Sequence, residues 1–224
     1  MRLGLRNGRF ITFEGGEGAG KSTQIRLLAA RLKDIAREIV LTREPGGTEL
    51  AEKLREYILA GKARNFGPIG EALLFSAARI DHLDRLIHPA IERGATVLCD
   101  RFADSTRAYQ GAKGEVADAT LLALEQVTLA GCAPDLTFIL DLPPEQGLAR
   151  ARARRGGEQA DRFEGEELDF HTALREKFRA IADKEPERCR LIDATKSAEE
   201  VAEAIWRAYA DRFLAHDPDE KKWA

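Results

Sequence analysis

Short apolar runs alternate along this chain with longer segments in which apolar residues recur every three or four positions. The short runs are rich in residues that favour β-strands and lie at residues 9–14, 38–42, 96–100, 136–142 and 190–193. Helical periodicity predicts helices at residues 21–35, 50–59, 71–94, 117–130, 145–154, 166–183 and 198–215. Strands that alternate with helices form a parallel sheet covered on both faces. The pattern therefore predicts an α/β fold with a five-stranded parallel sheet, whose ligands bind at the carboxyl ends of the strands.

Length and composition narrow the class of protein. The 224 residues fit one domain, residues 1–224, with an inserted lid at about 149–164 and a polar tail at 216–224. Hydrophobic content of 44%, charged content of 33% and a net charge of -3 indicate a soluble globular protein, with no sign of a nucleic-acid or membrane partner. The three cysteines are scattered, so we expect reduced thiols in a cytoplasmic protein.

The stretch EGGEGAGKST, Glu14–Thr23, lies between the first predicted strand and the first predicted helix. Gly15, four further residues, and then Gly20-Lys21-Ser22 fit the phosphate-binding loop G-x-x-x-x-G-K-[ST]. Glycines let the backbone wrap an anion with its N–H groups pointing inward, and the helix adds its positive dipole end. Lys21 can reach β- and γ-phosphates, and Ser22 can hold Mg²⁺. The alternative, a glycine-rich turn with an ordinary surface lysine, is disfavoured by the strand before and the helix after.

Asp100 and Arg101 end the third predicted strand. The apolar run ATVLC brings Asp100 beside the phosphate loop, where an acid orients Mg²⁺ directly or through water. The planar guanidinium of Arg101 suits a phosphoryl group that bridges two substrates. The alternative is an ordinary salt bridge at a strand end.

The long helix at residues 71–94 carries a second candidate site. Leu73, Ala77 and Ile80 share one face with Ile87, so we expect that stripe to face the core. Phe75 and Arg79 lie together near the opposite side, one turn apart, where Phe75 could stack a planar base and Arg79 could donate to a base carbonyl. The periodicity alone leaves open an alternative in which Phe75 packs under a loop and Arg79 pairs with an acid. His82 is interpreted as structural.

Three further stretches are more specific than the phosphate loop: TREPGGTELAEKLR, LLFSAARIDHL and DRFADSTRAYQG. With GGEGAGKST they resemble bacterial thymidylate kinase, and the resemblance extends over roughly Phe10 to Tyr209, including DRFE and LIDAT. It implies a P-loop NTPase fold and the transfer of the γ-phosphoryl group of ATP to dTMP, which gives dTDP and ADP with Mg²⁺ as cofactor. It also implies a homodimer formed through helices on one face of the sheet.

The resemblance also implies roles for individual residues. ATP would bind to Gly15, Gly16, Glu17, Gly18, Ala19, Gly20, Lys21, Ser22, Thr23, Arg150 and Arg154. The acceptor dTMP would bind to Glu17, Arg43, Glu44, Arg55, Phe75, Arg79, Arg101, Thr106, Tyr109 and Gln110. The catalytic residues would be Lys21, Arg101 and Arg154, and the metal would be held by Ser22 and Asp100. Glu17 would lie near the sugar 3′-OH, Arg55 at the dTMP phosphate, and Tyr109 beneath the deoxyribose, while residues 193–196 would border the adenine.

Arginines are dense between Ala149 and Glu164, and Gly156 and Gly157 interrupt the run. Such a run is usually a solvated basic face. The functional alternative is a lid that closes over ATP and brings an arginine to the transferring phosphoryl group. The phosphate loop has Ala19 where some relatives have an arginine, which by resemblance favours the lid and Arg154.

Two other functions share the phosphate loop. A kinase for another nucleoside monophosphate would share the fold, but the REPGG and AYQG stretches argue against it. A P-loop ATPase or GTPase that moves a partner usually carries a Glu after the strand-end Asp, or the guanine-reading NKxD. Here Arg101 follows Asp100 and NKxD is absent, which disfavours that class.

Overall fold

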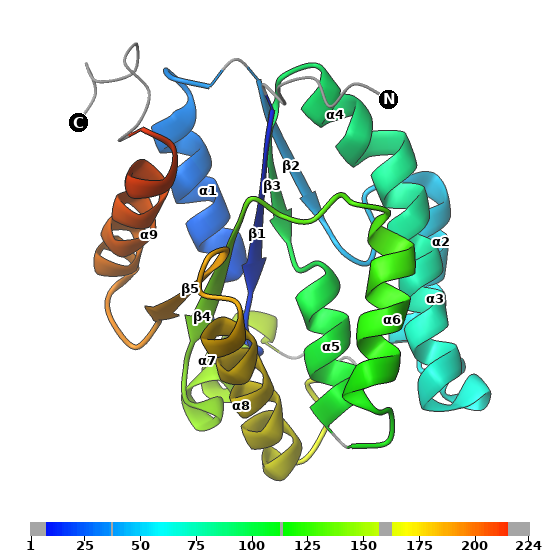
Figure 1. Ribbon diagram of the computed structural model, residues 1–224. Helices are drawn as coiled ribbons and strands as arrows, with labels where there is room; N and C mark the ends of the chain where they lie inside the picture. The colour runs from blue at the N-terminus through cyan, green and yellow to red at the C-terminus, as the bar shows by residue number, and fades with distance from the viewer. Residues whose placement is uncertain (1–7, 37, 113, 157–162, 215–224) are drawn as a thin grey trace.

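A parallel sheet forms the centre of the protein (Figure 1). The structure, a computed structural model, describes residues 8–36, 38–112, 114–156 and 163–214. Within them five strands pair in the order β2-β3-β1-β4-β5, all parallel. Their bounds are β1 Arg9–Glu14, β2 Ile39–Arg43, β3 Thr96–Asp100, β4 Leu136–Asp141 and β5 Cys189–Asp193. The predicted α/β fold and its five-stranded parallel sheet are therefore confirmed.

Helices cover both faces of this sheet. The α-helices are α1 Lys21–Leu32, α2 Glu49–Leu59, α3 Gly67–His82, α4 His88–Glu92, α5 Ala103–Ala112, α6 Asp118–Leu129, α7 Pro144–Arg155, α8 Leu168–Lys184 and α9 Ala198–Phe213. A 3₁₀ helix, η1, spans Lys62–Phe66, and a π-helical turn, η2, spans Leu83–Ile87. Helices α1 and α9 pack on one face, and α3 to α6 lie on the other (Figure 1). No helix in these ranges is long and apolar enough to span a membrane.

Two layers of apolar side chains fix the central strands. On the α1 and α9 side the buried cluster includes Phe13, Phe138 and Tyr209. On the other side Phe10 meets Phe102 edge to face, with ring centroids 4.8 Å apart. Because β1 and β4 are buried on both faces, most of their residues are apolar, and the hydroxyls of the buried Thr12 and Thr137 pair with each other at 2.8 Å.

The register of the sheet brings the chemically important loops together. Phe13 of β1 and Arg43 of β2 both lie opposite Asp100 of β3. The carboxyl ends of β1, β2 and β3 therefore meet at one edge of the sheet, and the loops that follow them share one site.

The prediction for the long helix is wrong in its buried face. Leu73 and Ile80 are about half exposed, at 51% and 44%, and Ala77 is exposed, whereas Arg79 and His82 are buried. The helix turns its polar side inward because that side meets the loop after β2. The π-helical turn Leu83–Ile87 then shifts the register of side chains, so Ile87 is fully buried and leaves the stripe.

Helix α5 was not predicted. Its sequence, ADSTRAYQGA, has no apolar periodicity, because its buried side includes Asp104, Thr106 and Gln110. Their partners come from other elements, and a single segment cannot show that. The polar tail at 216–224 and part of the predicted lid, residues 157–162, lie outside the described residues.

Candidate active site

The phosphate loop joins β1 to α1, and its glycines serve two purposes. Gly20 has φ 93° and caps the start of α1, a backbone conformation that disfavours a side chain. At Gly18 a Cβ atom would lie 2.0 Å from the carbonyl oxygen of Gly147 in α7, so the loop packs directly on that helix. At Gly16 and Gly20 the corresponding space is open. The absence of side chains therefore admits both a protein neighbour and, at the open positions, a ligand.

Lys21, the first residue of α1, bends back over the loop. Its Nζ donates to the carbonyl oxygens of Gly15 and Gly16, at 3.1 and 2.9 Å, and the residue is only 8% exposed. The alternative of an ordinary surface lysine is therefore wrong. Burial, followed by the positive charge of Arg101, lowers the pKa of Lys21 to about 8.

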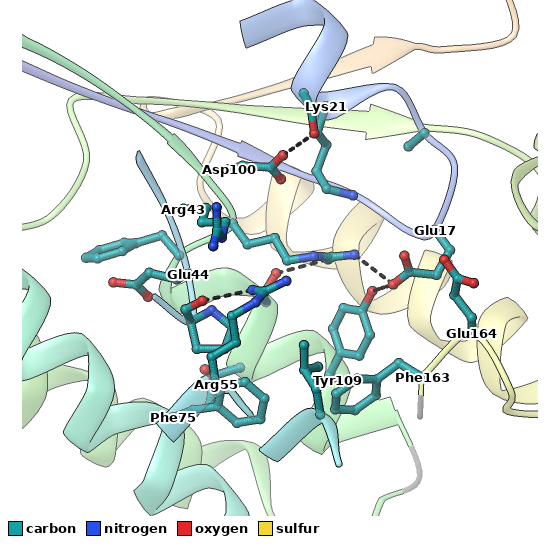
Figure 2. A pocket seen from close by; sticks show the side chains of 18 of the residues that line it. Glu17, Lys21, Arg43, Glu44, Arg55, Phe75, Asp100, Tyr109, Phe163 and Glu164 are labelled. Carbon is teal, nitrogen blue, oxygen red and sulfur yellow. Dashed lines mark hydrogen bonds and ion pairs between the residues drawn. The ribbon is translucent and has the colours of Figure 1, made fainter. Parts of the chain in front are cut away.

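Ser22 and Asp100 meet beside the loop. The Ser22 Oγ donates to the Asp100 Oδ2 at 2.6 Å, and both residues line a cavity that extends from the phosphate loop (Figure 2). A hydroxyl and a carboxylate are hard oxygen ligands, which suit Mg²⁺ when waters and substrate phosphates complete its shell. The described residues contain no cluster of three or more His, Cys, Asp or Glu that could hold a metal without such help.

Arg101 follows the last residue of β3 and pairs with Glu17 of the phosphate loop. Its Nη2 donates to Glu17 Oε1 at 2.7 Å, and its Nη1 donates to the Gly15 carbonyl at 3.0 Å. The Tyr109 hydroxyl donates to the same Glu17 oxygen at 2.6 Å, with the guanidinium over its ring (Figure 2). Burial alone would raise the pKa of Glu17, but the charges of Arg101 and Lys21 outweigh it and lower that pKa to about 2. Glu17 therefore stays ionised inside a phosphate-binding loop.

A second buried ion pair, Arg79 with Glu44, lies in the wall of the cavity formed by α3 and the loop after β2. Arg79 Nε donates to Glu44 Oε2 at 2.7 Å, with both side chains under 5% exposed. His82 contacts the other oxygen of Glu44 at 2.9 Å, and Arg79 Nη2 donates to Thr106 Oγ1 at 3.0 Å. Removing one member of such a pair leaves a buried charge unpaired, which costs about 3–5 kcal/mol. Arg79 and Glu44 therefore hold this wall together in addition to any contact with a ligand.

One cavity of about 520 Å³ joins the phosphate loop to that wall (Figure 2). Phe75 and Phe163 lie side by side at its lower end, with ring centroids 6.3 Å apart. Arg55 also lines the cavity, and its Nη1 donates to the Pro45 carbonyl at 2.8 Å. The cavity has cationic side chains at one end and aromatic rings at the other, which suits a nucleotide.

Comparison with known proteins gives the family. A family described as Thymidylate kinase matches residues 13–205. The chain is 61% identical to the thymidylate kinase of Rhodopseudomonas palustris (strain TIE-1) over 208 residues, 92% of this chain and 90% of that protein. It is 56% identical to that of Bradyrhizobium diazoefficiens, over 92% of this chain and 91% of that protein. A crystal structure of thymidylate kinase from Ehrlichia chaffeensis covers 90% of this chain and 98% of its own, with TM-score 0.73 and 34% identity.

This chain belongs to the thymidylate kinase family. Thymidylate kinases transfer a phosphoryl group from ATP to dTMP, and most residues that the sequence assigned to that reaction meet in the cavity. Its lining includes Glu17, Gly18, Ala19, Gly20, Lys21, Ser22, Thr23, Arg43, Glu44, Arg55, Phe75, Arg79, Asp100, Arg101, Thr106, Tyr109, Gln110 and Arg154. Gly15 and Gly16, the first glycines of the loop, line a smaller cavity next to this one.

Two members of the predicted thymidylate kinase site have other partners. Arg150 Nη1 donates to the Ala194 carbonyl at 3.1 Å, at the loop that follows β5, and does not line the cavity. Arg43 is largely exposed and pairs with Glu52 at 3.0 Å, although it also reaches the cavity. Arg150 therefore lies beside the segment that the sequence associates with adenine, away from the phosphate end.

Arg154, in the predicted lid, lines the cavity. Its guanidinium lies 3.5 Å from Glu164 and its side chain is 69% exposed. Two other arginines of the run between Ala149 and Glu164 cannot be placed in this way, because Arg162 and the side chain of Arg155 lie outside what the structure describes. The lining residues Phe163 and Glu164 were missed as site residues, although they belong to the DRFE stretch that carries the resemblance.

Proposed function

We propose that the cavity is the joint site of ATP and dTMP, and that Arg101 stabilises the phosphoryl group as it passes between them. As a thymidylate kinase, the chain gives dTDP and ADP. The observation that carries the proposal is the position of Arg101: its guanidinium donates to Gly15 and Glu17 of the donor loop and lies over the ring of Tyr109, an expected dTMP-site residue. A planar guanidinium can contact two phosphate groups at once.

The donor end binds the ATP phosphates. Backbone N–H groups of the loop and the N-terminus of α1 face a polyphosphate, and Lys21 would leave its two carbonyl partners to contact the β- and γ-phosphates. Ser22 and Asp100 would hold Mg²⁺, which neutralises phosphate charge when bound. A magnesium requirement is part of this proposal.

The acceptor in this reaction needs no general base. A phosphate monoester has a second pKa near 6, so at neutral pH its oxygen is already an anion that can attack the γ-phosphorus. The work left to the protein is to align the two anions and offset their repulsion. The pairing of Arg101 with Glu17, and the cationic Arg43 and Arg55 along the cavity, fit that task.

The base and sugar of dTMP would bind at the aromatic end. Phe75 offers a ring face, Arg79 and Gln110 offer polar atoms, and Tyr109 lies between them and Glu17. We propose that the Tyr109 ring packs beneath the deoxyribose and that Glu17 lies near the 3′-OH. Closure of the lid would then bring Arg154 from its exposed position to the transferring phosphoryl group and exclude water.

Turnover with a panel of acceptors tests this function. ATP-Mg²⁺ with dTMP should give the highest kcat/KM among the nucleoside monophosphates, and a higher value for dCMP or UMP would refute the assignment of the acceptor pocket. Arg101→Lys keeps the charge but loses the planar fork, so it should lose most of the kcat that Arg101→Ala loses. Equal activity of Arg101→Lys and the unmodified enzyme would remove the bridging role.

We also propose that the chain works as a homodimer in the cytoplasm. Ile69, Leu73 and Ile80 on α3 and Leu122 on α6 are between 41% and 52% exposed, and α3 and α6 pack against each other, so these residues form an apolar surface. Leu73→Glu should lower the mass measured by light scattering from that of two chains to that of one. A mass of one chain for the unmodified protein would refute the dimer. Cys99 and Cys189 are buried free thiols, in keeping with a reducing compartment.

A further inference from the structure

Glu14 is a buried acid that the reaction outlined above does not use. It is the last residue of β1, it is 0% exposed, and the phosphate loop starts at the next residue. A carboxyl group is seldom buried without hydrogen-bond partners. The partners of Glu14 show which part of the site it holds.

The hydrogen-bond partners of the Glu14 carboxyl group lie at the start of α5. Glu14 Oε1 accepts from the backbone N–H of Phe102 at 2.8 Å and from that of Ser105 at 3.3 Å. Its Oε2 accepts from the Ser105 Oγ at 2.6 Å. The first N–H groups of a helix have no partner within the helix. Glu14 therefore caps α5 from a strand that is more than 80 residues away in the chain.

The residue immediately before this cap is Arg101, and its backbone is unusual. Arg101 has φ 68°, the left-handed region that non-glycine residues rarely adopt and keep only where their surroundings fix it. Its N–H donates to the Phe13 carbonyl at 2.9 Å, while the next N–H, that of Phe102, donates to Glu14. The end of β1 thus holds both peptide groups that flank the Arg101 α-carbon.

The side chain of Arg101 is tied to the same cap. Its Nη1 donates to the Ser105 Oγ at 3.3 Å, and that hydroxyl is the one that meets Glu14. Glu14 therefore reaches Arg101 along two routes, through the backbone at Phe102 and through the Ser105 hydroxyl.

We propose that Glu14 is a positioning residue for phosphoryl transfer. By capping α5 it fixes the turn from Arg101 to Ser105, so that the Arg101 guanidinium stays between the phosphate loop and the acceptor site. This inference rests on the bridging role proposed for Arg101. Misplacement of a catalytic group by 1 Å can lower a rate about 10²-fold, so the expected effect is on kcat.

When Glu14 is neutral, Oε1 still accepts from the two backbone N–H groups and the protonated Oε2 donates to the Ser105 Oγ in place of accepting from it, and a glutamine can form the same set of bonds. Burial, followed by the negative charge of Asp104, raises the pKa of Glu14 to about 8, so the acid is mostly protonated at pH 7. In Glu14→Gln the amide oxygen can accept from the two backbone N–H groups, and the amide nitrogen can donate to the Ser105 Oγ. Glu14→Leu has a similar volume and can make none of these bonds.

The experiment compares kcat and KM for both substrates in these two variants, with and without Arg101→Ala. Glu14→Leu should lower kcat about 10²-fold while changing KM about threefold or less, and Glu14→Gln should keep kcat within about threefold. In the Arg101→Ala background, Glu14→Leu should lower the remaining kcat by no more than about twofold, because its effect passes through Arg101. Ser105→Ala, which keeps the two backbone bonds, should lower kcat less than Glu14→Leu, and it serves if Glu14→Leu does not fold.

The outcomes separate the two proposals. If Arg101→Ala keeps its kcat, the bridging role of Arg101 fails. If Arg101→Ala loses its kcat while Glu14→Leu, folded by thermal melting, keeps it, only the role of Glu14 fails. An equal loss from Glu14→Leu in both backgrounds would also overturn the inference, because it would mean a general structural effect.

Discussion

The cavity floor and the predicted lid each carry an arginine that we propose to contact the transferring phosphoryl group, yet the two arginines are held in opposite ways. The floor, defined here as residues 14–23 with 100–106, holds Arg101 at three acceptors and side-chain exposure of 18%. The lid holds Arg154 by one contact of 3.5 Å, with the side chain 69% exposed. The protein itself therefore fixes Arg101, whereas in our proposal Arg154 would become fixed only when the lid closes.

This difference assigns different tasks to the two arginines. A preorganised charge needs no rearrangement at the moment of reaction, and that is where electrostatic stabilisation is strongest. A mobile one can admit substrate, exclude water on closing and release product. We expect changes to the floor to act on chemistry itself, and changes to the lid to act on closure as well.

The largest expected effect comes from the floor. Lys21→Met keeps the aliphatic stem in its buried position and removes the charge, so kcat should fall by more than about 10³-fold, because loss of one preorganised donor costs about 10²–10³ and the charge adds to it. Coupled turnover measures the rate, and circular dichroism checks the fold. A variant that kept near-normal kcat would refute the phosphate-loop interpretation.

The lid gives the next effect. Arg154→Ala should lower kcat about 10²–10³-fold and change the KM for dTMP much less, since the guanidinium would meet the phosphoryl group only in transit. Arg152→Ala is the matched control, because Arg152 is also an exposed arginine of α7 and does not line the cavity. An unchanged kcat in Arg154→Ala would move the role to another arginine or abolish it.

Features local to one segment could be predicted from the sequence. Five strands and the phosphate loop have strong local patterns: apolar runs of β-forming residues, and glycines at fixed spacing before a lysine. The face of α3 could not be predicted, because its buried side pairs Arg79 with Glu44, which lies 35 residues earlier. Periodicity assumes that apolar residues face inward, and at this site the inward side is charged.

The contacts that support the site could not be predicted from the sequence either. Helix α5 lacks apolar periodicity, and its cap comes from Glu14. The REPGG and DRFADSTRAYQG stretches predicted which residues gather, by resemblance, but not that Tyr109 donates to Glu17 or that Lys21 is buried. Such contacts depend on the register of the sheet, which brings residues 17 and 109 together across 92 positions.

A smaller effect is expected on the preference of the enzyme for deoxyribose over ribose, at Tyr109 beside the floor. Tyr109 is 8% exposed, its ring packs edge to face on Phe163, and its hydroxyl is engaged by Glu17. A ribose 2′-hydroxyl placed against that ring would be buried without a partner, which costs about 1–3 kcal/mol, roughly tenfold to a hundredfold in preference. Tyr109→Ala should therefore bring the kcat/KM ratio of dTMP over ribothymidine monophosphate towards one.

Tyr109→Phe sharpens that experiment. It keeps the ring and loses only the bond to Glu17, so it should lower turnover of both substrates and leave their ratio unchanged. If Tyr109→Ala lowers both substrates equally and the ratio stands, the ring only packs α5 and does not select the sugar.

The smallest effect concerns stability, and it follows from the burial of the floor. The pKa of Glu14 is about 8 in the folded protein, against 4.5 when exposed, because burial and Asp104 outweigh the hydrogen bond from Ser105 and the charge of Arg101. Three further titratable groups interact electrostatically with Glu14: Lys21 of α1, Cys99 of β3 and Cys189 of β5. The folded state therefore binds the Glu14 proton more tightly than the unfolded state.

The sign of the pH dependence follows. The stability that this proton contributes is fully present below pH 4.5 and is lost as pH rises through about 8. Lys21 acts in a different pH window: its pKa is about 8 in the folded protein and 10.5 when exposed, so its effect on stability lies above pH 8.

Glu14→Gln cannot lose a proton, so its free energy of unfolding should rise relative to the unmodified protein by more than about 1 kcal/mol between pH 5 and pH 8. Urea titrations at pH 5, 6.5 and 8 measure this difference. Glu200→Gln is the control, because Glu200 is an exposed residue in the first turn of α9 whose pKa is lowered, so it should add no slope in that range. A constant difference between Glu14→Gln and the unmodified protein would mean that Glu14 is ionised throughout, and the floor would then hold a carboxylate in place of a neutral acid.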